Sequence, residues 1–83
     1  MQRQTLKHTL MDKVTIGLNA GVVWRLLSNN EAWDRERLLR ASGLSECELC
    51  AAIGWLARED KVEFGHDDAR GCDIVRLPFT VYL

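Results

Sequence analysis

Residues 34–56, which read DRERLLRASGLSECELCAAIGWL, contain the strongest structural signals in the chain. Asp34 is a residue type that caps helix N-termini, because its carboxylate accepts a bond from a free backbone N–H. Trp33 before it and Leu38 after it have the spacing of a hydrophobic staple. Gly43 is the residue type that accepts the left-handed conformation at the end of a helix without steric cost. We therefore expect a helix that begins after Asp34 and ends at Gly43.

A second helix is predicted immediately after this one. Ser45 and Glu48 form a capping box, and the helix it starts covers residues 45–60. Its apolar stripe recurs at helical spacing and consists of Leu49, Ala52, Ile53 and Leu56. A connection as short as the one at Gly43 makes two helices cross steeply. The pattern indicates a helix-turn-helix.

The residues before this motif suggest a strand and a further helix. Residues 13–18 alternate between apolar and other side chains, which predicts a half-buried strand. Asn19 can cap a helix over residues 20–29, whose apolar positions follow helical spacing. Residues 1–10 show no period, and Met11 stands where the pattern begins, so we expect a flexible extension there.

Beyond residue 60 the apolar period changes from helical to two. Residues 61–64 and 72–77 each alternate, and the turn-rich segment 65–71 between them predicts a β-hairpin. Pro78 ends the second strand because it has no N–H to donate. The order strand, three helices, two strands is that of an α+β winged helix-turn-helix domain, which we assign to residues 11–83.

Three stretches also resemble a known family. They are GLNAGVVW at 17–24, GLS at 43–45 and AIGWLAREDKV at 52–62, the last being the most specific. They are similar to signature stretches of short bacterial winged helix-turn-helix proteins of uncharacterised function, over residues 11–64. The resemblance implies the fold and suggests dimers, and it supplies no ligand or catalytic residues.

The charge balance bears on whether this domain binds DNA. The chain has 83 residues, 11 basic and 12 acidic, and residues 11–83 hold nine basic and twelve acidic side chains. The second helix of a helix-turn-helix enters the major groove, but residues 45–60 contain four acidic side chains and only Arg58 as a cation. DNA-binding domains usually show a basic patch. Two hypotheses therefore remain open.

The first hypothesis is a DNA-binding, transcription-regulator-like module. The predicted contacts lie on the outer face of residues 45–60, in the hairpin turn and on the preceding helix: Ser45, Cys47, Ala51, Gly54, Arg58, Arg70, Arg35 and Arg37. Arg40, and Arg3, Lys7 and His8 in the extension, are further basic candidates. The second hypothesis is a protein partner on the same small-residue face. We expect Trp55 to fold under the hairpin and complete the core.

The cysteines favour a reducing compartment. Cys47, Cys50 and Cys72 are an odd number, and no signal peptide precedes them, so we expect a cytoplasmic protein with small buried thiols. With His66, the three cysteines could be drawn as a zinc site, and the C-x-x-C pair as a redox motif, but neither is favoured. We expect no metal and no cofactor.

The sequence offers no catalytic constellation. The histidines, His8 and His66, fall in the extension and the turn, and the acidic pairs 59–60 and 67–68 are typical of solvated charges. There is no phosphate-binding loop, no dinucleotide fingerprint and no apolar run long enough for a membrane span. We expect a non-enzymatic protein without a small-molecule substrate.

Finally, the apolar surface predicts a homodimer. Val22 and Trp24 lie on opposite flanks of the predicted helix 20–29, whose apolar arc is too wide for one small domain. The predicted strand 13–18 would add an unpaired edge that a second chain or the apolar tail 79–83 could cover.

Overall fold

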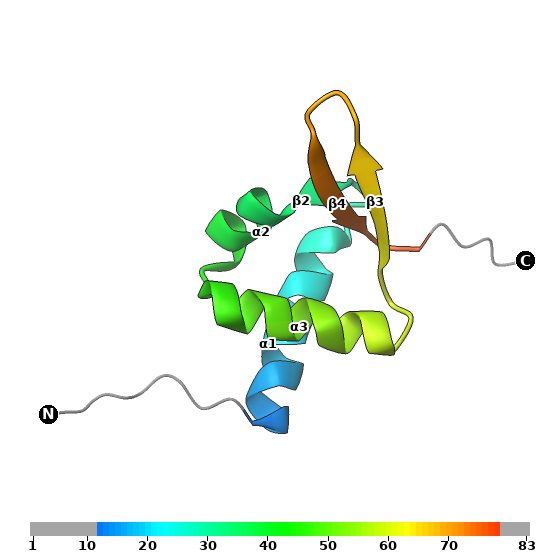
Figure 1. Ribbon diagram of the computed structural model, residues 1–83. Coiled ribbons are helices and arrows are strands. Elements are labelled where there is room, and N and C mark those ends of the chain that lie inside the picture. Colours follow the sequence, from blue (N-terminus) through cyan, green and yellow to red (C-terminus); the bar gives the residue numbers. More distant parts are fainter. Residues whose placement is uncertain (1–11, 79–83) are drawn as a thin grey trace, which may run out of the picture.

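The computed structural model describes residues 12–78 (Figure 1). The expectations for segments 1–10 and 79–83, with the basic residues Arg3, Lys7 and His8, lie outside the described residues. The elements, in chain order, are α1 (Lys13–Leu27), β2 (Trp33–Asp34), α2 (Arg35–Ser42), α3 (Glu46–Arg58), β3 (Glu63–Asp67) and β4 (Cys72–Arg76). This arrangement confirms the winged helix-turn-helix prediction, and the β3–β4 hairpin is its wing.

The helix-turn-helix forms where the sequence signals place it. The Asp34 carboxylate accepts a bond from the backbone N–H of Arg37 at 2.7 Å, and α2 ends at Gly43 with φ of 73°. The capping box is complete, since Ser45 Oγ accepts from the N–H of Glu48 and the Glu48 carboxylate accepts from the N–H of Ser45. These local bonds fix both ends of the turn between α2 and α3.

The predicted strand at residues 13–18 is wrong, because these residues form the first half of α1. Asp12 is the N-cap, and its carboxylate accepts a bond from the N–H of Thr15 at 2.7 Å. Val14 and Leu18 are one helical turn apart and exposed, whereas Ile16 lies toward α3. The alternation therefore reflects two helix faces. The predicted end at residue 29 is close to the observed end at Leu27.

The strand outside the hairpin comes after α1 rather than before it. β2 pairs with β4 through Trp33 opposite Val75, and the antiparallel sheet has the order β2-β4-β3. The hairpin is confirmed, but β3 extends to Asp67, further than the predicted turn allowed. Residues 68–71 form the turn, in which Gly71 has φ of 67°.

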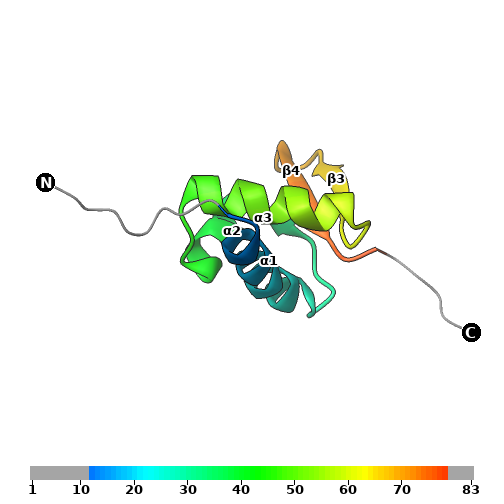
Figure 2. The ribbon, with the colours of Figure 1, turned by 90° about the horizontal axis from the view of Figure 1, so that it is seen from below.

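All three helices and the sheet share one apolar core. In Figure 2, α3 lies across α1, and the hairpin stands beyond these helices. The buried side chains are Ala20, Val23, Leu27, Trp33, Leu38, Leu49, Ala52, Leu56, Val62 and Val75. α3 is thus fixed on one side by the core, which leaves its opposite face to solvent.

Candidate macromolecule-binding site

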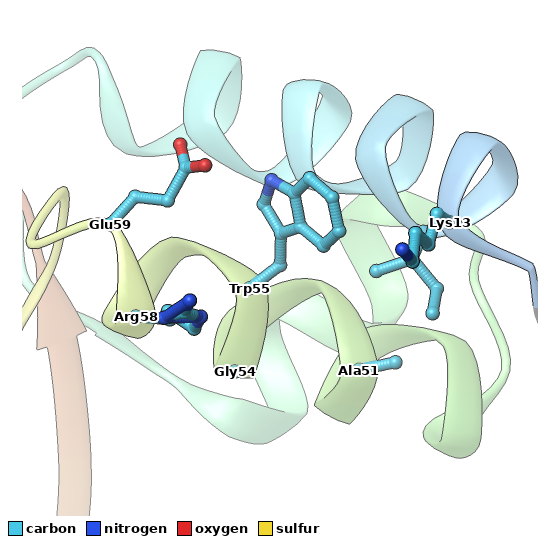
Figure 3. Close-up of a pocket in the computed structure, with 7 residues that line it drawn as sticks. Lys13, Ala51, Gly54, Trp55, Arg58 and Glu59 are labelled. Carbon is cyan, nitrogen blue, oxygen red and sulfur yellow. The ribbon is translucent and has the colours of Figure 1, made fainter.

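An open groove lies between α1 and the exposed face of α3, with a volume of about 780 Å³ (Figure 3). We call it the α1–α3 groove; it is lined by Lys13, Ile16, Ala51, Gly54, Trp55, Arg58 and Glu59. The Trp55 indole points from α3 toward α1. A Cβ added at Gly17 would lie 3.8 Å from Trp55 Cζ2, so the ring packs beside a glycine of α1.

This position corrects the expectation for Trp55. The ring is half-buried and packs against the core from the α1 side, rather than under the wing. The reason is the extra length of α1, whose first half occupies the place where a strand was predicted. Part of the indole therefore forms a wall of the groove.

The groove contains cations without ion pairs. Among residues 12–78, Lys13 and Arg58 make no ion pair, and both line the groove. The carboxylate in the groove, Glu59, is 3.5 Å from Lys61 Nζ. Two positive charges are thus available to an anionic partner, while the negative charge is partly neutralised. Sequence reasoning missed Lys13, which the N-cap signal of Asp12 and Thr15 could have placed on a helix.

The exposed face of α3 is made of small side chains. Cys47, Cys50 and Gly54 are exposed and Ala51 is half-buried. The expectation of buried thiols is therefore wrong for Cys47 and Cys50, because α3 turns their side away from the core; Cys72 on β4 is half-buried. A Cβ added at Gly54 would have no atom within 4 Å. A partner surface can approach the α3 backbone closely along this face.

Three of the four arginines predicted to bind phosphate are already bound within the protein. Arg35 lies 3.7 Å from Glu46, and Arg37 lies 3.0 Å from Glu31 with its guanidinium 3.9 Å from the centre of the Trp33 ring. Arg70 donates to Asp34. Arg58, the fourth of these arginines, makes no ion pair within residues 12–78. The Ser45 hydroxyl, also predicted as a contact, is occupied by the capping box.

A second charged region joins α2 to the wing. We call it the α2–wing junction; it is lined by Asp34, Arg35, Glu36, Arg40, Arg70, Cys72 and Asp73. The Asp34 carboxylate is at its centre, since one oxygen caps α2 and the other accepts from Arg70. The N–H of Arg37, followed by the Arg70 guanidinium, holds the pKa of Asp34 below its ordinary value of 3.8. The same bond to Asp34 raises the pKa of Arg70.

The tip of the wing is acidic. His66 Nδ1 lies 2.9 Å from Asp73 Oδ1 across the hairpin, and Asp68 is almost fully exposed. Asp67 accepts the backbone N–H bonds that shape the turn. Arg76, on the wing, pairs with Glu63. The described part of the wing therefore offers no unpaired cation to a phosphate backbone.

The residues predicted for a dimer lie on α1. Val22 is half-buried and Trp24 is 43% exposed, and Val14 and Leu18 add exposed apolar surface on the same helix. The edge strand that was expected to contribute is absent, because residues 13–18 are helical. Any apolar interface at this place would have to use a helix face.

Two features are absent from residues 12–78. No group of three or more His, Cys, Asp or Glu side chains in residues 12–78 is placed to hold a metal ion. None of the helices in this part of the chain has the length and apolar character needed to cross a membrane.

Comparison with known proteins places this fold in a family. Residues 11–75 match the model of the winged helix-turn-helix domain DUF2582. A protein from Methanocaldococcus jannaschii described as uncharacterized, MJ1608, is 40% identical over 57 residues, which are 66% of this chain and 81% of that protein.

A solved structure agrees with this assignment. The solution NMR structure of protein BT2368 from Bacteroides thetaiotaomicron has a TM-score of 0.71 and 34% identity, and the match covers 88% of this chain and 92% of that chain. The relatives come from an archaeon and a bacterium, so membership of this family does not confirm the expected bacterial origin. The chain belongs to the DUF2582 family of winged helix-turn-helix domains.

Proposed function

We propose that the protein is a non-enzymatic, transcription-regulator-like module that binds double-stranded DNA through the exposed face of α3. α3 is the second helix of the helix-turn-helix, the element that such folds place in the major groove. We also propose a cytoplasmic location, because an odd number of cysteines argues against a disulfide framework and is typical of a reducing compartment. Fold alone does not determine function, so the proposal depends on the side chains at the face.

The observation that carries the proposal is the pair of unpaired cations beside this face. Lys13 and Arg58 flank the small side chains of Ala51 and Gly54. Small side chains let a DNA backbone come close, and the two cations then reach phosphates. Each neutralised phosphate contributes about −0.9 to the slope of log affinity against log salt concentration. Two contacts predict a shallow slope of about −1.8, and hence weak binding that is strongest at low salt.

The test is fluorescence anisotropy with a labelled random-sequence duplex over a series of salt concentrations. Binding at low salt with a slope near −1.8 supports the proposal. Ala51→Arg and Gly54→Arg add a cation on the contact face and should strengthen non-specific binding. Absence of binding at the lowest salt contradicts the proposal, because the phosphate contribution is then largest.

A protein partner is the second candidate, and the charge of the molecule favours it. The wing tip is acidic and Arg70 is bound to Asp34, so the wing does not supply phosphate contacts. The half-buried Trp55 beside Ala51 and Gly54 provides an apolar anchor of the kind found at protein interfaces. If the partner is a protein, Gly54→Arg should abolish its capture, because the substitution buries a charge at an apolar contact. If the partner is DNA, the same substitution should strengthen binding. This one substitution therefore separates the two candidates.

We further propose that the protein is a homodimer that uses the outer side of α1. Val14 and Leu18 are 71% and 68% exposed and one helical turn apart, and Trp24, which is 43% exposed, lies on a flank of the same helix. A two-fold contact would use the same patch on both chains, so Trp24→Glu should alter both sides of the interface.

Sedimentation equilibrium at tens of micromolar tests this proposal. The wild-type protein should have the dimer mass and Trp24→Glu the monomer mass. Phe64→Glu is the control, since Phe64 is 59% exposed on the wing rather than on α1. A monomeric wild-type protein would refute the dimer, and a dimeric Trp24→Glu would move the interface elsewhere.

A further inference from the structure

We propose that Cys47 and Cys50 form a redox-responsive thiol pair on the exposed face of α3, and that closing this pair to a disulfide weakens binding at that face. Both cysteines are free and exposed. They occupy the second and fifth positions of α3, in its N-terminal half. The effect on binding rests on the proposed DNA-binding function, whereas formation of the disulfide does not.

Helix geometry brings the Cα atoms of the two cysteines within the range that a disulfide spans. Residues three apart in an α-helix have Cα atoms about 5 Å apart. Disulfides span Cα separations of about 4.4–6.8 Å. Cys72 is half-buried on β4, where it lines the α2–wing junction, so it is not part of the pair. A disulfide between Cys47 and Cys50, within α3, is therefore the expected product.

Closure would disturb the start of α3. A disulfide needs Cβ atoms about 3.5–4.5 Å apart, which is closer than a regular helix places residues of this spacing. The first turns must tighten, and Glu48 lies between the two cysteines. Its carboxylate and N–H both bind Ser45 in the capping box. The disulfide therefore strains the N-terminal bonds of the helix proposed to enter the groove of DNA.

The chemistry balances with hydrogen peroxide as the oxidant. One thiolate attacks a peroxide oxygen, the O–O bond breaks, and a sulfenic acid and water form once protons are taken up. The second thiol attacks the sulfenic sulfur, the S–S bond forms, and a second water leaves. The protein loses two protons and two electrons, and the peroxide is reduced to two waters. Thiols such as dithiothreitol reverse the step by exchange.

Peptide mass spectrometry tests the bond itself. Trypsin releases residues 41–58, which contain both thiols, and residues 71–76, which contain Cys72. After treatment with one equivalent of peroxide, peptide 41–58 should be about 2 Da lighter, and dithiothreitol should restore its mass. Cys47→Ser and Cys50→Ser should each abolish the change, and Cys72→Ser should leave it intact. An unchanged peptide, or a bond that involves Cys72, overturns the proposal.

Anisotropy tests the consequence for binding. The oxidised protein should bind duplex DNA several-fold more weakly than the reduced protein, and the Cys47→Ser/Cys50→Ser double variant should not respond to peroxide. If the disulfide forms and the oxidised and reduced proteins bind DNA with the same affinity, the proposal that the disulfide weakens binding is overturned. If the disulfide forms and neither state binds DNA, the DNA-binding function fails while the thiol pair stands.

Discussion

The α2–wing junction and the α1–α3 groove are both lined by cations and carboxylates, but they use them differently. At the junction, Asp34 binds Arg70 and caps α2, and Arg35 pairs with Glu46. In the groove, Lys13 and Arg58 have no ion pair among the described residues. Arginines on the surface of this fold are therefore not equivalent. At the junction, Arg70 holds the wing to the start of α2 and Arg35 links α2 to α3, whereas Lys13 and Arg58 in the groove are available to a partner.

This difference separates stability from binding. Substitutions at the junction should change the free energy of unfolding, because they leave a buried carboxylate or an apolar cavity without compensation. Substitutions in the groove should leave unfolding nearly unchanged, because exposed unpaired side chains contribute little to it.

The largest effect is expected in the core, at Leu38 of α2, the helix that Asp34 caps. This side chain is fully buried and anchors α2 to the core. Leu38→Ala should lower the free energy of unfolding by about 2–5 kcal/mol, because it removes apolar contacts and leaves a cavity. Urea denaturation measures the loss. Phe64→Ala is the control, since Phe64 is 59% exposed on the wing, outside the proposed dimer surface, and its truncation should cost much less than that of Leu38. Equal losses in both variants would contradict the observed packing of α2.

Asp34 should have the next largest effect. Asp34→Ala removes the cap of α2 and leaves Arg70 without its acceptor. We expect the melting temperature to fall by about 4–8 °C, the shift typical of losing one such interaction in a domain of this size. Asp34→Asn keeps a capping oxygen and should lose less. Calorimetry measures the melting temperature. If Asp34→Ala melted at the same temperature as the wild type, the bonds of Asp34 at the junction would not stabilise the fold.

The same carboxyl predicts a dependence on pH. The pKa of Asp34 is lowered in the folded state, first by the N–H of Arg37 and then by Arg70. A lowered pKa means that the stabilisation is present above the unfolded-state pKa and is lost as the pH falls through the folded-state pKa. Melting curves recorded from neutral to acidic pH should therefore show a fall in stability below the ordinary value of 3.8 that is smaller in Asp34→Asn.

The two regions also differ in what the sequence could reveal. The caps at Asp34 and Ser45 and the turn at Gly43 depend on near neighbours, so residues 34–56 predicted the helix-turn-helix correctly. The bond between Arg70 and Asp34 joins residues 36 positions apart, and no local pattern shows it. The sequence therefore could not show that Arg70 pairs within the protein, and its role as a phosphate contact stays a prediction.

The N-terminal half of α1 shows why a local pattern can mislead. Alternation at Val14, Ile16 and Leu18 fits a strand, but Ile16 is the residue of the three that turns toward α3. The decisive signal was the cap formed by Asp12 and Thr15. Once residue 13 is placed on a helix, its amine lies in the groove, and the site gains a second cation that sequence analysis had left out.

Substitutions in the α1–α3 groove should change DNA affinity and leave the free energy of unfolding nearly unchanged. Arg58→Gln removes an unpaired cation, which should lower DNA affinity a few-fold and reduce the salt slope by about 0.9. Arg25→Gln is a close control, because Arg25 is also exposed, unpaired among the described residues and in the last turn of a helix, but lies on α1. Both variants should unfold like the wild type in urea. Equal losses of affinity would show that overall charge, rather than the groove, attracts DNA.

The smallest effect is expected from one methyl group at Gly54. Gly54 and Gly21 both lie inside helices, and a Cβ added at either would have no atom within 4 Å. Replacing each by alanine should raise the free energy of unfolding by about 0.4–1 kcal/mol, because the unfolded chain loses freedom. Only Gly54→Ala adds its methyl group to the exposed face of α3, so of these two variants only this one should weaken binding to DNA, and slightly; in Gly54→Arg the added cation outweighs the same steric cost. Urea denaturation and anisotropy on the two variants measure both quantities. If Gly54→Ala gains stability and binds as well as Gly21→Ala, close approach of a partner to α3 is not needed, and the contact must lie nearer to Lys13 and Arg58.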